Sequence, residues 1–405
     1  MKNNSPAIVI GGGVNALGVI RNLGRNGIDV YCVVEKKDEA IYSKYCKGYY
    51  VFPGIAQSKE KVKTFLTEFK RQMNCEIVVF PTSDLSVLNV SQVLTELTGF
   101  RIVLSDFKIL ETMIKKRQFY QSLLERNVPH PTTLFPDLKD SISIGKRLSF
   151  PVFIKPSVSQ LFNKKFGKKG FVANSEKELH NYLQLMDKHK IDVMIQEIIP
   201  GTAENHFFID GYFDKDSKPV ALFARRRLRM WPLWFGNSSV CVSVPLSEVA
   251  EMKDDIVKYL GAIGYRGIFS AEFKRDPRDN VCKLIEVNAR SWWYNSFPSA
   301  CGVNIILMAY LDAVGVDVEE ITDYAAGIHL INFLEDLKSS LAMISQKQLT
   351  FREWLTPLIR KKDMTVFARD DLVPFAMNFF QSIAEFANKE KRSRLLGSKS
   401  KIESK

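Results

Sequence analysis

The chain has 405 residues, of which 46% are hydrophobic and 25% are charged, and its formal net charge is +12. This composition predicts a globular protein of two to four compact units, and the positive charge favours anionic partners. We expect a cytoplasmic protein without a zinc site or a nucleic-acid partner, because no membrane-length apolar run, secretory signal, C-x-x-C spacing or RNA-binding pattern occurs.

Residues 1–112 alternate strand and helix patterns and predict a doubly wound parallel sheet of the Rossmann type. The first strand runs into "GGGVNALG", in which Gly11, Gly13 and Ala16 give G-x-G-x-x-A, and the second strand ends in Glu35. Taken alone, these residues indicate a nicotinamide or flavin dinucleotide site and an oxidoreductase.

A second unit begins with the helix pattern "KRQFYQSLLERN" and continues into the short apolar strand "FPVFIKP", which carries Lys155. The following loop, "NKKFGKKG", contains Gly167 and Gly170, whose backbone N–H groups could approach a phosphate. A solvated basic surface loop is the alternative. Further on, "QEIIPG" forms a strand-to-turn hinge with Glu197 and Ile199, and Glu204 follows it.

The segment "GIFSAEFKRDPRDNVCKLIEVNAR" predicts a β-hairpin, because two alternating strands flank the turn residues "DPRDN". Symmetry about Asp279 places Glu272 opposite Glu286, on one face with Asn288 and Arg290. The core face then carries Ala271, Phe273, Ile285, Val287 and Ala289. Facing carboxylates with an amide oxygen suit Mg²⁺, although ordinary surface ion pairs are the alternative.

In their order and spacing, Lys116, Lys155, the glycine loop, the hinge and the group Glu272, Glu286 and Asn288 resemble the ATP-grasp superfamily. The stretch "ALFARRRLRMWPLWFG" and the hairpin after it look like the carboxylate–amine ligase branch that includes D-aspartate ligases. The resemblance implies a mixed α/β and α+β fold with four parts. These are a Rossmann-like domain (1–112), a small ATP-grasp subdomain with a flap (113–195), a large subdomain with the metal site (196–326) and a helical C-terminal extension (327–405).

Carried over to this sequence, the resemblance implies that Lys116 and Lys155 hold ATP phosphates under a flap at about 161–170, with Lys115 competing for the role of Lys116. The backbone at Glu197 and Ile199 would meet adenine and Glu204 the ribose, with Gly167 and Gly170 also binding the nucleotide. Glu272, Glu286 and Asn288 would hold Mg²⁺ or Mn²⁺. The glycine-rich N-terminal segment would then border the substrate site, and Glu35 would be a surface acid at a strand end.

The implied reaction converts a carboxylate into an acyl phosphate, which an amine attacks to form an amide. Arg290 is the first candidate to stabilise the developing charge, and Arg226 and Arg229 are the next. We expect substrate specificity in "FPTSD" (80–84) and "SWWYNSFPSACG" (291–302). The partners would be ATP and small carboxylates and amines, including a nucleotide- or lipid-linked glycan or cell-wall precursor. A catalytically silent nucleotide-binding module stays an alternative.

The C-terminal part is predicted to be helical, with Phe375, Phe379, Ile383 and Phe386 on one apolar face that Phe380 widens. The last 17 residues contain seven basic and two acidic side chains. Two interpretations stay open: the helix docks on a monomeric or homodimeric ligase body, or it holds the enzyme on the anionic cytoplasmic face of a membrane.

Overall fold

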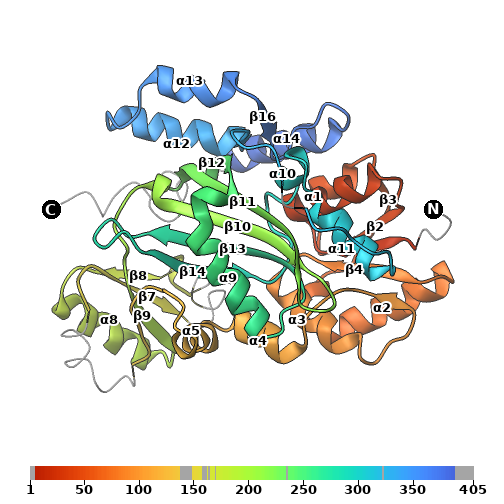
Figure 1. Ribbon diagram of the computed structural model, residues 1–405, viewed down its shortest axis with the longest axis horizontal. Coiled ribbons are helices and arrows are strands. Elements are labelled where there is room, and N and C mark those ends of the chain that lie inside the picture. Colours follow the sequence, from red (N-terminus) through yellow and green to blue (C-terminus); the bar gives the residue numbers. More distant parts are fainter. Residues whose placement is uncertain are drawn as a thin grey trace.

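The computed structural model describes residues 5–136, 148–156, 162, 165–168, 170–233, 236–321 and 323–387, and every structural statement below concerns these residues. They form three sheets, which lie in chain order from the right of Figure 1 to its lower left and centre. Residues 161, 163, 164 and 169 of the predicted flap at 161–170 and the whole basic end at 389–405 lie outside the described residues.

The first sheet is parallel, in the order β3-β2-β1-β4-β5. It comprises β1 (Ala7–Ile10), β2 (Val30–Val34), β3 (Cys46–Val51), β4 (Ile77–Pro81) and β5 (Phe100–Arg101). Helix α1 (Gly13–Gly24) packs on one face, and α2 (Lys59–Met73) and α3 (Asp84–Val93) pack on the other. Both faces of β1, β2 and β4 are therefore buried, which explains why these three strands are almost wholly apolar, and the arrangement confirms the predicted doubly wound sheet. The short 3-10 helices η1 (Glu39–Tyr42) and η2 (Ile55–Gln57) lie in its loops.

Two helices, α4 (Phe107–Ile114) and α5 (Lys116–Glu125), lead into an antiparallel sheet of order β6-β9-β7-β8. Its strands are β6 (Thr133–Leu134), β9 (Val193–Glu197), β7 (Val152–Pro156) and β8 (Phe171–Ala173), and α8 (Glu176–Lys188) covers one face. The sheet places Lys155 and Glu197 on neighbouring strands. The predicted strand at Lys155 is thus observed.

The third and largest sheet has the order β14-β13-β10-β11-β12-β15-β16. Its strands are β10 (His206–Phe213), β11 (Pro219–Trp231), β12 (Asn237–Val244), β13 (Gly267–Arg275), β14 (Cys282–Asn288), β15 (His329–Ile331) and β16 (Lys362–Met364). Helices α9 (Ala250–Ala262), α10 (Phe297–Ala300) and α11 (Ile305–Ala313) and the 3-10 helices η3 (Ala203–Asn205) and η4 (Leu246–Val249) complete this region. One face packs on α4, α5 and α9, whereas part of the other faces the first sheet.

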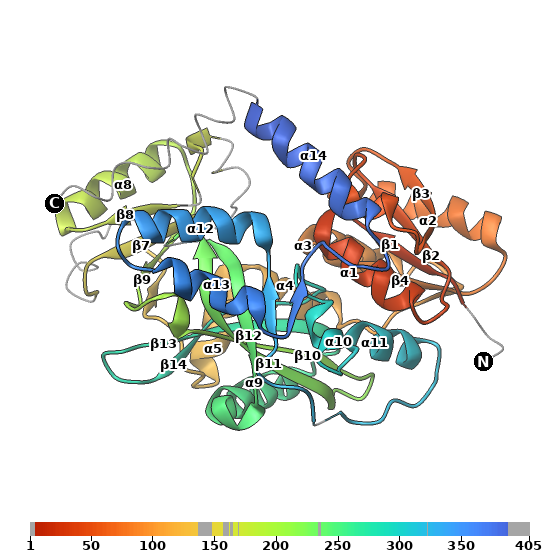
Figure 2. The ribbon, with the colours of Figure 1, turned by 90° about the horizontal axis from the view of Figure 1, so that it is seen from above.

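The C-terminal part contains α12 (Phe333–Ser345), α13 (Phe351–Ile359) and α14 (Val373–Ala387), which lie along the top of the molecule in Figure 1. Seen from above in Figure 2, α12 and α13 lie over the third sheet, and α14 lies apart from them, near the first sheet. The C-terminal part is not wholly helical, because β15 and β16 extend the third sheet from this segment. A buried ion pair between Arg21 and Asp371, with 2.9 Å between Nε and Oδ2, fixes it to α1. Among the described helices, none has the length and apolarity needed to cross a lipid bilayer.

Candidate active site

The hairpin of β13 and β14 has the register that turn symmetry predicts, since Glu272 pairs with Glu286 and Ser270 pairs with Asn288. The sequence does not predict a bulge directly after Glu272, where the register shifts so that Phe273 pairs with Leu284. As a result Leu284 joins the core, and the prediction that Ile285 lies on the core face is wrong. The bulge leaves the carbonyl of Ile285 to accept a hydrogen bond from Tyr120 Oη at 2.6 Å.

Glu272 is the more buried of the two facing carboxylates, with 15% of its side chain exposed. Its Oε1 lies 2.7 Å from His206 Nδ1 on β10 and 3.2 Å from Arg227 Nη2 on β11. Burial alone would raise the pKa of Glu272, but Arg227 and His206 outweigh burial and hold the pKa at about 2. The Glu272 carboxylate is therefore ionised at neutral pH, in an ion pair with Arg227.

Glu286 and Asn288 lie beside further charged side chains. Lys116 Nζ, at the start of α5, is 3.7 Å from Glu286 Oε2, and Asn288 Oδ1 accepts a hydrogen bond from Arg290 Nη2 at 3.0 Å. Arg290 Nε in turn donates to Asp84 Oδ1 at 2.6 Å, although 206 residues separate the two in the sequence. The site thus combines acids of the third sheet with Lys116 and Asp84, which come from earlier parts of the chain.

Lys155 on β7 donates a hydrogen bond from Nζ to Gln196 Oε1 at 2.9 Å. Burial, reinforced by the positive charge of Lys116, lowers the pKa of Lys155 to about 8. Gly170 lies against the same strand, because a Cβ there would be 2.5 Å from the carbonyl oxygen of Ile154. Gly167 has a φ of 65°, a backbone conformation that favours glycine.

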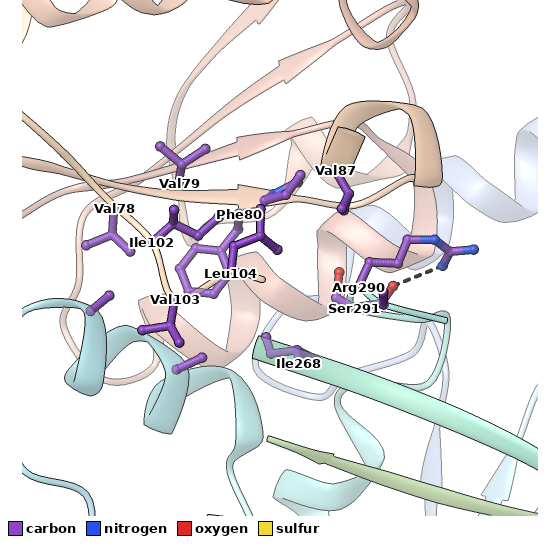
Figure 3. A pocket seen from close by; sticks show the side chains of 14 residues that line it. Val78, Val79, Phe80, Val87, Ile102, Val103, Leu104, Ile268, Arg290 and Ser291 are labelled. Atoms are coloured by element: carbon purple, nitrogen blue, oxygen red, sulfur yellow. Dashed lines mark hydrogen bonds between the residues drawn. The ribbon is translucent and has the colours of Figure 1, made fainter. Parts of the chain in front are cut away.

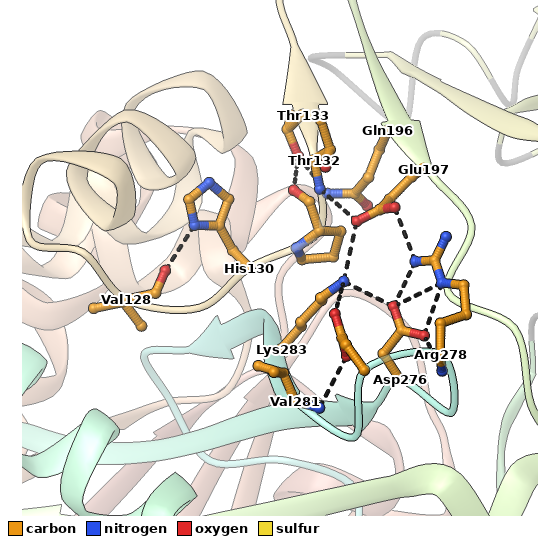
Figure 4. A network of polar contacts seen from close by, with 12 residues as sticks. Val128, His130, Thr132, Thr133, Gln196, Glu197, Asp276, Arg278, Val281 and Lys283 are labelled. Carbon is orange, nitrogen blue, oxygen red and sulfur yellow. Dashed lines mark hydrogen bonds and ion pairs between the residues drawn. The ribbon is translucent and has the colours of Figure 1, made fainter. Parts of the chain in front are cut away.

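At the predicted hinge, the side chain of Glu197 is held in a network of ion pairs (Figure 4). Its Oε1 accepts a hydrogen bond from the backbone of Thr132 at 2.8 Å, and its Oε2 accepts one from Arg278 Nη2 at 2.9 Å. Asp276 in the hairpin turn and Lys283 on β14 complete the network. The carboxylate therefore ties β9 to the β13–β14 turn, while the carbonyl of Ile199 accepts a bond from Lys274 Nζ at 2.7 Å.

Two predicted arginines point away from this group. Arg226 donates to Glu204 Oε2 at 3.1 Å, so the predicted ribose-binding acid and the predicted catalytic cation pair with each other. Arg229 Nε donates to the buried Asp336 of α12 at 2.7 Å. Neither arginine lines the cavity described next, whereas Arg225 and Arg227 do.

A cavity of about 680 Å³ lies between the first and third sheets and contains the facing carboxylates. The third sheet contributes its wall across strands β14, β13, β10, β11 and β12, a width of about 19 Å at ~4.8 Å per strand. Predicted specificity residues line it: Thr82, Ser83 and Asp84 from "FPTSD", and Trp292, Trp293 and Tyr294 from "SWWYNSFPSACG". The segment Gly11 to Gly13 also borders this cavity.

The glycine-rich segment does not present a free helix N-terminus to a dinucleotide. Asp38 Oδ2 accepts a hydrogen bond from Gly13 N at 2.9 Å, and Asp38 Oδ1 accepts one from Ala40 N at 3.0 Å. A Cβ on Gly12 would lie 1.8 Å from Asp38 Oδ2, so glycine is required for this approach. A carboxylate of the chain itself occupies the anion position at α1, which argues against the dinucleotide interpretation.

Behind Arg290 lies a much smaller, mainly apolar cavity of about 30 Å³, shown in Figure 3. Its walls include Phe80, Leu104 and Ile268, and the Arg290 side chain extends away from these apolar groups. The cavity has room for about one water molecule, so it is a packing feature of the contact between the sheets.

The donor set of the large cavity fits a hard divalent cation that shares its ligands with phosphate. In the described part of the chain, no group of three His, Cys, Asp or Glu side chains could enclose a metal ion without other ligands. Glu272, Glu286 and the amide oxygen of Asn288 supply oxygen donors from two paired strands. Mg²⁺ commonly takes one or two carboxylates and completes its coordination with nucleotide phosphates and water.

Sequence reasoning did not find His206, Arg225, Arg227 or the role of Asp84 as the partner of Arg290. Strand alternation indicates that Arg225 and Arg227 share a face, but it does not tell which face is inside. The partners of His206 and Asp84 lie 66 and 206 residues away, and no local pattern signals such contacts.

No known family profile matches the sequence. The sequence is 25% identical over 324 residues to D-aspartate ligase of Enterococcus faecium (strain Aus0004), a match that covers 76% of each chain. The fold is similar to N5-carboxyaminoimidazole synthetase from Staphylococcus aureus complexed with ADP, with a TM-score of 0.63, 13% identity and coverage of 80% and 81% of the two chains.

A second similar structure is the biotin carboxylase domain of 2-oxoglutarate carboxylase from Hydrogenobacter thermophilus, in complex with MgADP, ADP and bicarbonate. Here the TM-score is 0.59, with 18% identity and coverage of 78% and 72%. The chain is thus similar in sequence to a D-aspartate ligase and in fold to two ADP-bound proteins, which agrees with the resemblance to the ATP-grasp carboxylate–amine ligases.

Proposed function

We propose that this enzyme uses ATP to phosphorylate a carboxylate and then joins the acyl group to an amine. The observation that carries the proposal is the pairing of Glu272 with Glu286, which brings two carboxylates together where Lys116 and Arg290 also lie. Like charges directly opposite each other on paired strands destabilise a sheet, and a bound cation reverses this effect. Such an arrangement is expected of a metal-nucleotide site.

In this proposal, Lys116 and Lys155 bind the α- and β-phosphates, together with the backbone at Gly167 and Gly170. The backbone of Glu197 and Ile199 contacts adenine, and Glu204 binds the ribose. Since the Glu197 carboxylate is engaged by Thr132 and Arg278, its side chain is left to hold the hinge in place.

Glu272, Glu286 and Asn288 would hold Mg²⁺, with Mn²⁺ as the alternative, and the ion would neutralise phosphate charge during transfer. Arg290 is the residue that we assign to the transferring phosphoryl group and the later oxyanion, because its side chain reaches the same group of oxygens. Arg226 and Arg229 are not assigned such roles, because Glu204 and Asp336 already neutralise them.

The relative indicates an amino acid as the carboxylate, since that protein is a ligase of D-aspartate. The cavity extends well beyond the facing carboxylates to β12, and it includes Trp293, which is 44% exposed. An exposed aromatic ring suits the C–H face of a sugar ring. We therefore propose that the amine belongs to a larger molecule such as a cell-wall precursor or a nucleotide- or lipid-linked glycan.

A peripheral membrane contact through the C-terminal part belongs to the same proposal. Helix α14 packs on η1 of the first unit, while Phe379 and Phe380 are 40% and 64% exposed. The side chains of Ile383 and Phe386 and the basic residues 389–405 lie outside the described residues. The exposed phenylalanines support an interfacial helix, and an anionic surface would match the basic sequence that follows.

The test is an assay of ADP and phosphate release with Mg²⁺, with L- and D-amino acids as carboxylates and hydroxylamine as a general nucleophile. Hydroxylamine converts an acyl phosphate to a coloured hydroxamate, so the product reports the first half-reaction directly. We expect hydroxamate with at least one acidic amino acid. ATP binding without any hydroxamate would favour the silent nucleotide-binding module, and a fluorescence response to NADH in place of ATP would favour the oxidoreductase.

A further inference from the structure

We propose that Asp84 binds the amine substrate as its ammonium ion and takes a proton from it when the amide forms. This inference rests on the proposed function and adds a catalytic residue from the first unit to it. It begins from the 2.6 Å hydrogen bond between Arg290 Nε and Asp84 Oδ1, which places a carboxylate directly beside the residue assigned to the oxyanion.

The amine presents a chemical requirement that the residues discussed above do not meet. An alkyl amine is almost wholly protonated at neutral pH, and an ammonium ion has no lone pair with which to attack an acyl phosphate. A carboxylate near the acyl carbon would hold the ammonium ion and accept its proton, as a general base does. The side chain must lie near Arg290, because that arginine marks the position of the oxyanion.

Five acidic residues of the described chain line the large cavity: Glu35, Asp38, Asp84, Glu272 and Glu286. Glu272 and Glu286 are assigned to the metal ion. The two oxygens of Asp38 accept the backbone N–H groups of Gly13 and Ala40. Glu35 lies at the end of β2 and is contacted by Gln57 Nε2 at 3.4 Å.

Asp84 therefore differs from the other four. It is the first residue of α3, its side chain is 48% exposed, and the cavity lies against it. Oδ1 accepts the bond from Arg290, and the structure of the described residues records no hydrogen-bond donor at Oδ2. Among the five acids and within the described residues, Asp84 is the one that contacts Arg290, and its Oδ2 is open to an N–H group beside the arginine assigned to the oxyanion.

One N–H proton of the ammonium ion moves to Asp84, and the freed lone pair forms the N–C bond with the acyl carbon. The bond from that carbon to the phosphate oxygen breaks, and its electron pair leaves with the phosphate, which takes a second proton from nitrogen. Asp84 then returns its proton to water. The products are the amide, hydrogen phosphate and one proton.

The neighbouring hydrogen bonds would hold Asp84 and Arg290 next to each other. Asn15 Nδ2 donates to the carbonyls of Thr82 and Ser291 at 2.7 and 2.8 Å, so one buried amide joins the residues that flank this pair. The glycine-rich "GGGVN" segment thereby acquires a role, because its asparagine joins the segment before Asp84 to the loop after β14 that carries Arg290 and Ser291.

The experiment compares two nucleophiles that differ in charge. Hydroxylamine is mostly neutral at pH 7.5, whereas an alkyl amine such as the lysine side chain is mostly protonated. Wild-type enzyme is first assayed with hydroxylamine and a panel of amino acids, and then with the best acid and a panel of amines that includes L-lysine, D-lysine and ethanolamine. The same two assays are applied to Asp84→Asn, which keeps the size of the side chain and loses the negative charge.

We expect Asp84→Asn to lower the rate with the alkyl amine at least ~100-fold, the scale of a lost general base, and to lower hydroxamate formation less than about threefold. The matched control is Asp106→Asn. Asp106 also pairs with an arginine, Arg266 at 3.1 Å, but it lies outside the cavity, and we expect both rates to stay at the wild-type level. Arg290→Lys should lower both rates, because it acts on the acyl phosphate itself.

Equal losses with the two nucleophiles in Asp84→Asn would show that Asp84 acts only by positioning Arg290, and the proposal would fail. It would also fail if neither rate changed. Failure of the proposed function looks different, since wild-type enzyme would then form no hydroxamate with any acid. Circular dichroism of each variant verifies that the fold is retained.

Discussion

Lys155 on β7 and Gln196 on β9 are diagonal neighbours, since Lys155 pairs with Met194, and Lys155 Nζ donates a hydrogen bond to Gln196 Oε1 at 2.9 Å. Burial and the nearby charge of Lys116 lower the pKa of Lys155 to about 8. In the free enzyme the ammonium group therefore loses its proton as the pH rises through about 8, whereas an unfolded lysine keeps it to about 10.4. The charge available to a phosphate group decreases over the same pH range.

From this we expect the affinity for a non-hydrolysable ATP analogue with Mg²⁺ to decrease between pH 7.5 and 9.5. Binding should take up a proton, because phosphate favours the charged lysine. Isothermal titration in buffers of different ionisation enthalpy measures both quantities. Lys155→Arg stays charged and should remove most of the pH dependence. An affinity that is the same at both pH values in wild-type enzyme would contradict the assignment of Lys155 to phosphate.

Because the pKa of Lys155 is lower in the folded protein than in the unfolded chain, the folded state binds fewer protons than the unfolded state between about pH 8 and 10.4. The contribution of Lys155 to the free energy of unfolding therefore rises with pH across this window. Wild-type protein should show this contribution in urea unfolding relative to Lys155→Met, and the difference between the two should be constant below about pH 7.

The facing carboxylates give a second prediction. Glu286→Gln or Asn288→Ala should reduce Mg²⁺-dependent turnover at least ~100-fold, the scale of losing a major stabiliser of the transition state. The melting temperature should stay close to the wild-type value or increase for Glu286→Gln, because the repulsion with Glu272 is relieved. Asp279→Asn, in the turn of the same hairpin, serves as a control and should retain wild-type turnover. Near wild-type ATP consumption by the first two variants would contradict the metal site.

The third prediction concerns Asp371. Its carboxylate accepts hydrogen bonds from Arg21 Nε at 2.9 Å, Ser43 Oγ at 2.7 Å and the backbone of Lys44 at 3.0 Å, and both members of the ion pair are almost fully buried. Asp371→Ala leaves a buried arginine without its partner, and we expect a loss of about 3–5 kcal/mol in the free energy of unfolding.

Asp370→Ala provides the comparison, because the Arg25–Asp370 pair is 37% and 41% exposed and should contribute no more than about 1 kcal/mol. Urea unfolding monitored by tryptophan fluorescence measures both variants. Similar losses for Asp370→Ala and Asp371→Ala would mean that the buried pair is not the contact that fixes the C-terminal part.

Membrane contact provides the fourth prediction. Co-sedimentation with anionic vesicles should decrease on removal of residues 388–405, and also in the double variant Phe379→Ser and Phe380→Ser. Added salt should weaken binding, since each Lys or Arg near an anionic surface contributes roughly 1 kcal/mol. Vesicles of neutral lipid are the control. Equal sedimentation of full-length and shortened protein would leave only the docked helix.

The sequence predicts those parts of the site that depend on local rules. The turn residues around Asp279 set the hairpin register, and alternation along β13 and β14 then brings Glu272, Glu286 and Asn288 to one face. The bulge at Ile285 could not be predicted in this way, because it goes with contacts to distant parts of the chain. Tyr120 donates a hydrogen bond to the Ile285 carbonyl, and Leu284 packs in the core beneath the sheet.

Long-range pairing explains the other differences. Arg226 and Arg229 could not be separated from Arg225 and Arg227 by sequence, since the inner face of β11 depends on what packs against it and the register shifts near Arg227. Strands β15 and β16 have three residues each, too few for a periodic signal. They form because β15 pairs with β12 at the edge of the third sheet and β16 pairs with β15.

The ion pair between Arg21 and Asp371 also has a consequence for synthesis on the ribosome. The two residues are 350 positions apart. At about 5–20 residues per second, Asp371 is therefore synthesised roughly 20–70 seconds after Arg21. During that interval the first sheet can form, but α1 carries an unpaired cation on a surface that is later covered. A chaperone that engages the nascent chain in this period would meet α1 uncovered, and release of the finished chain would remove that binding surface.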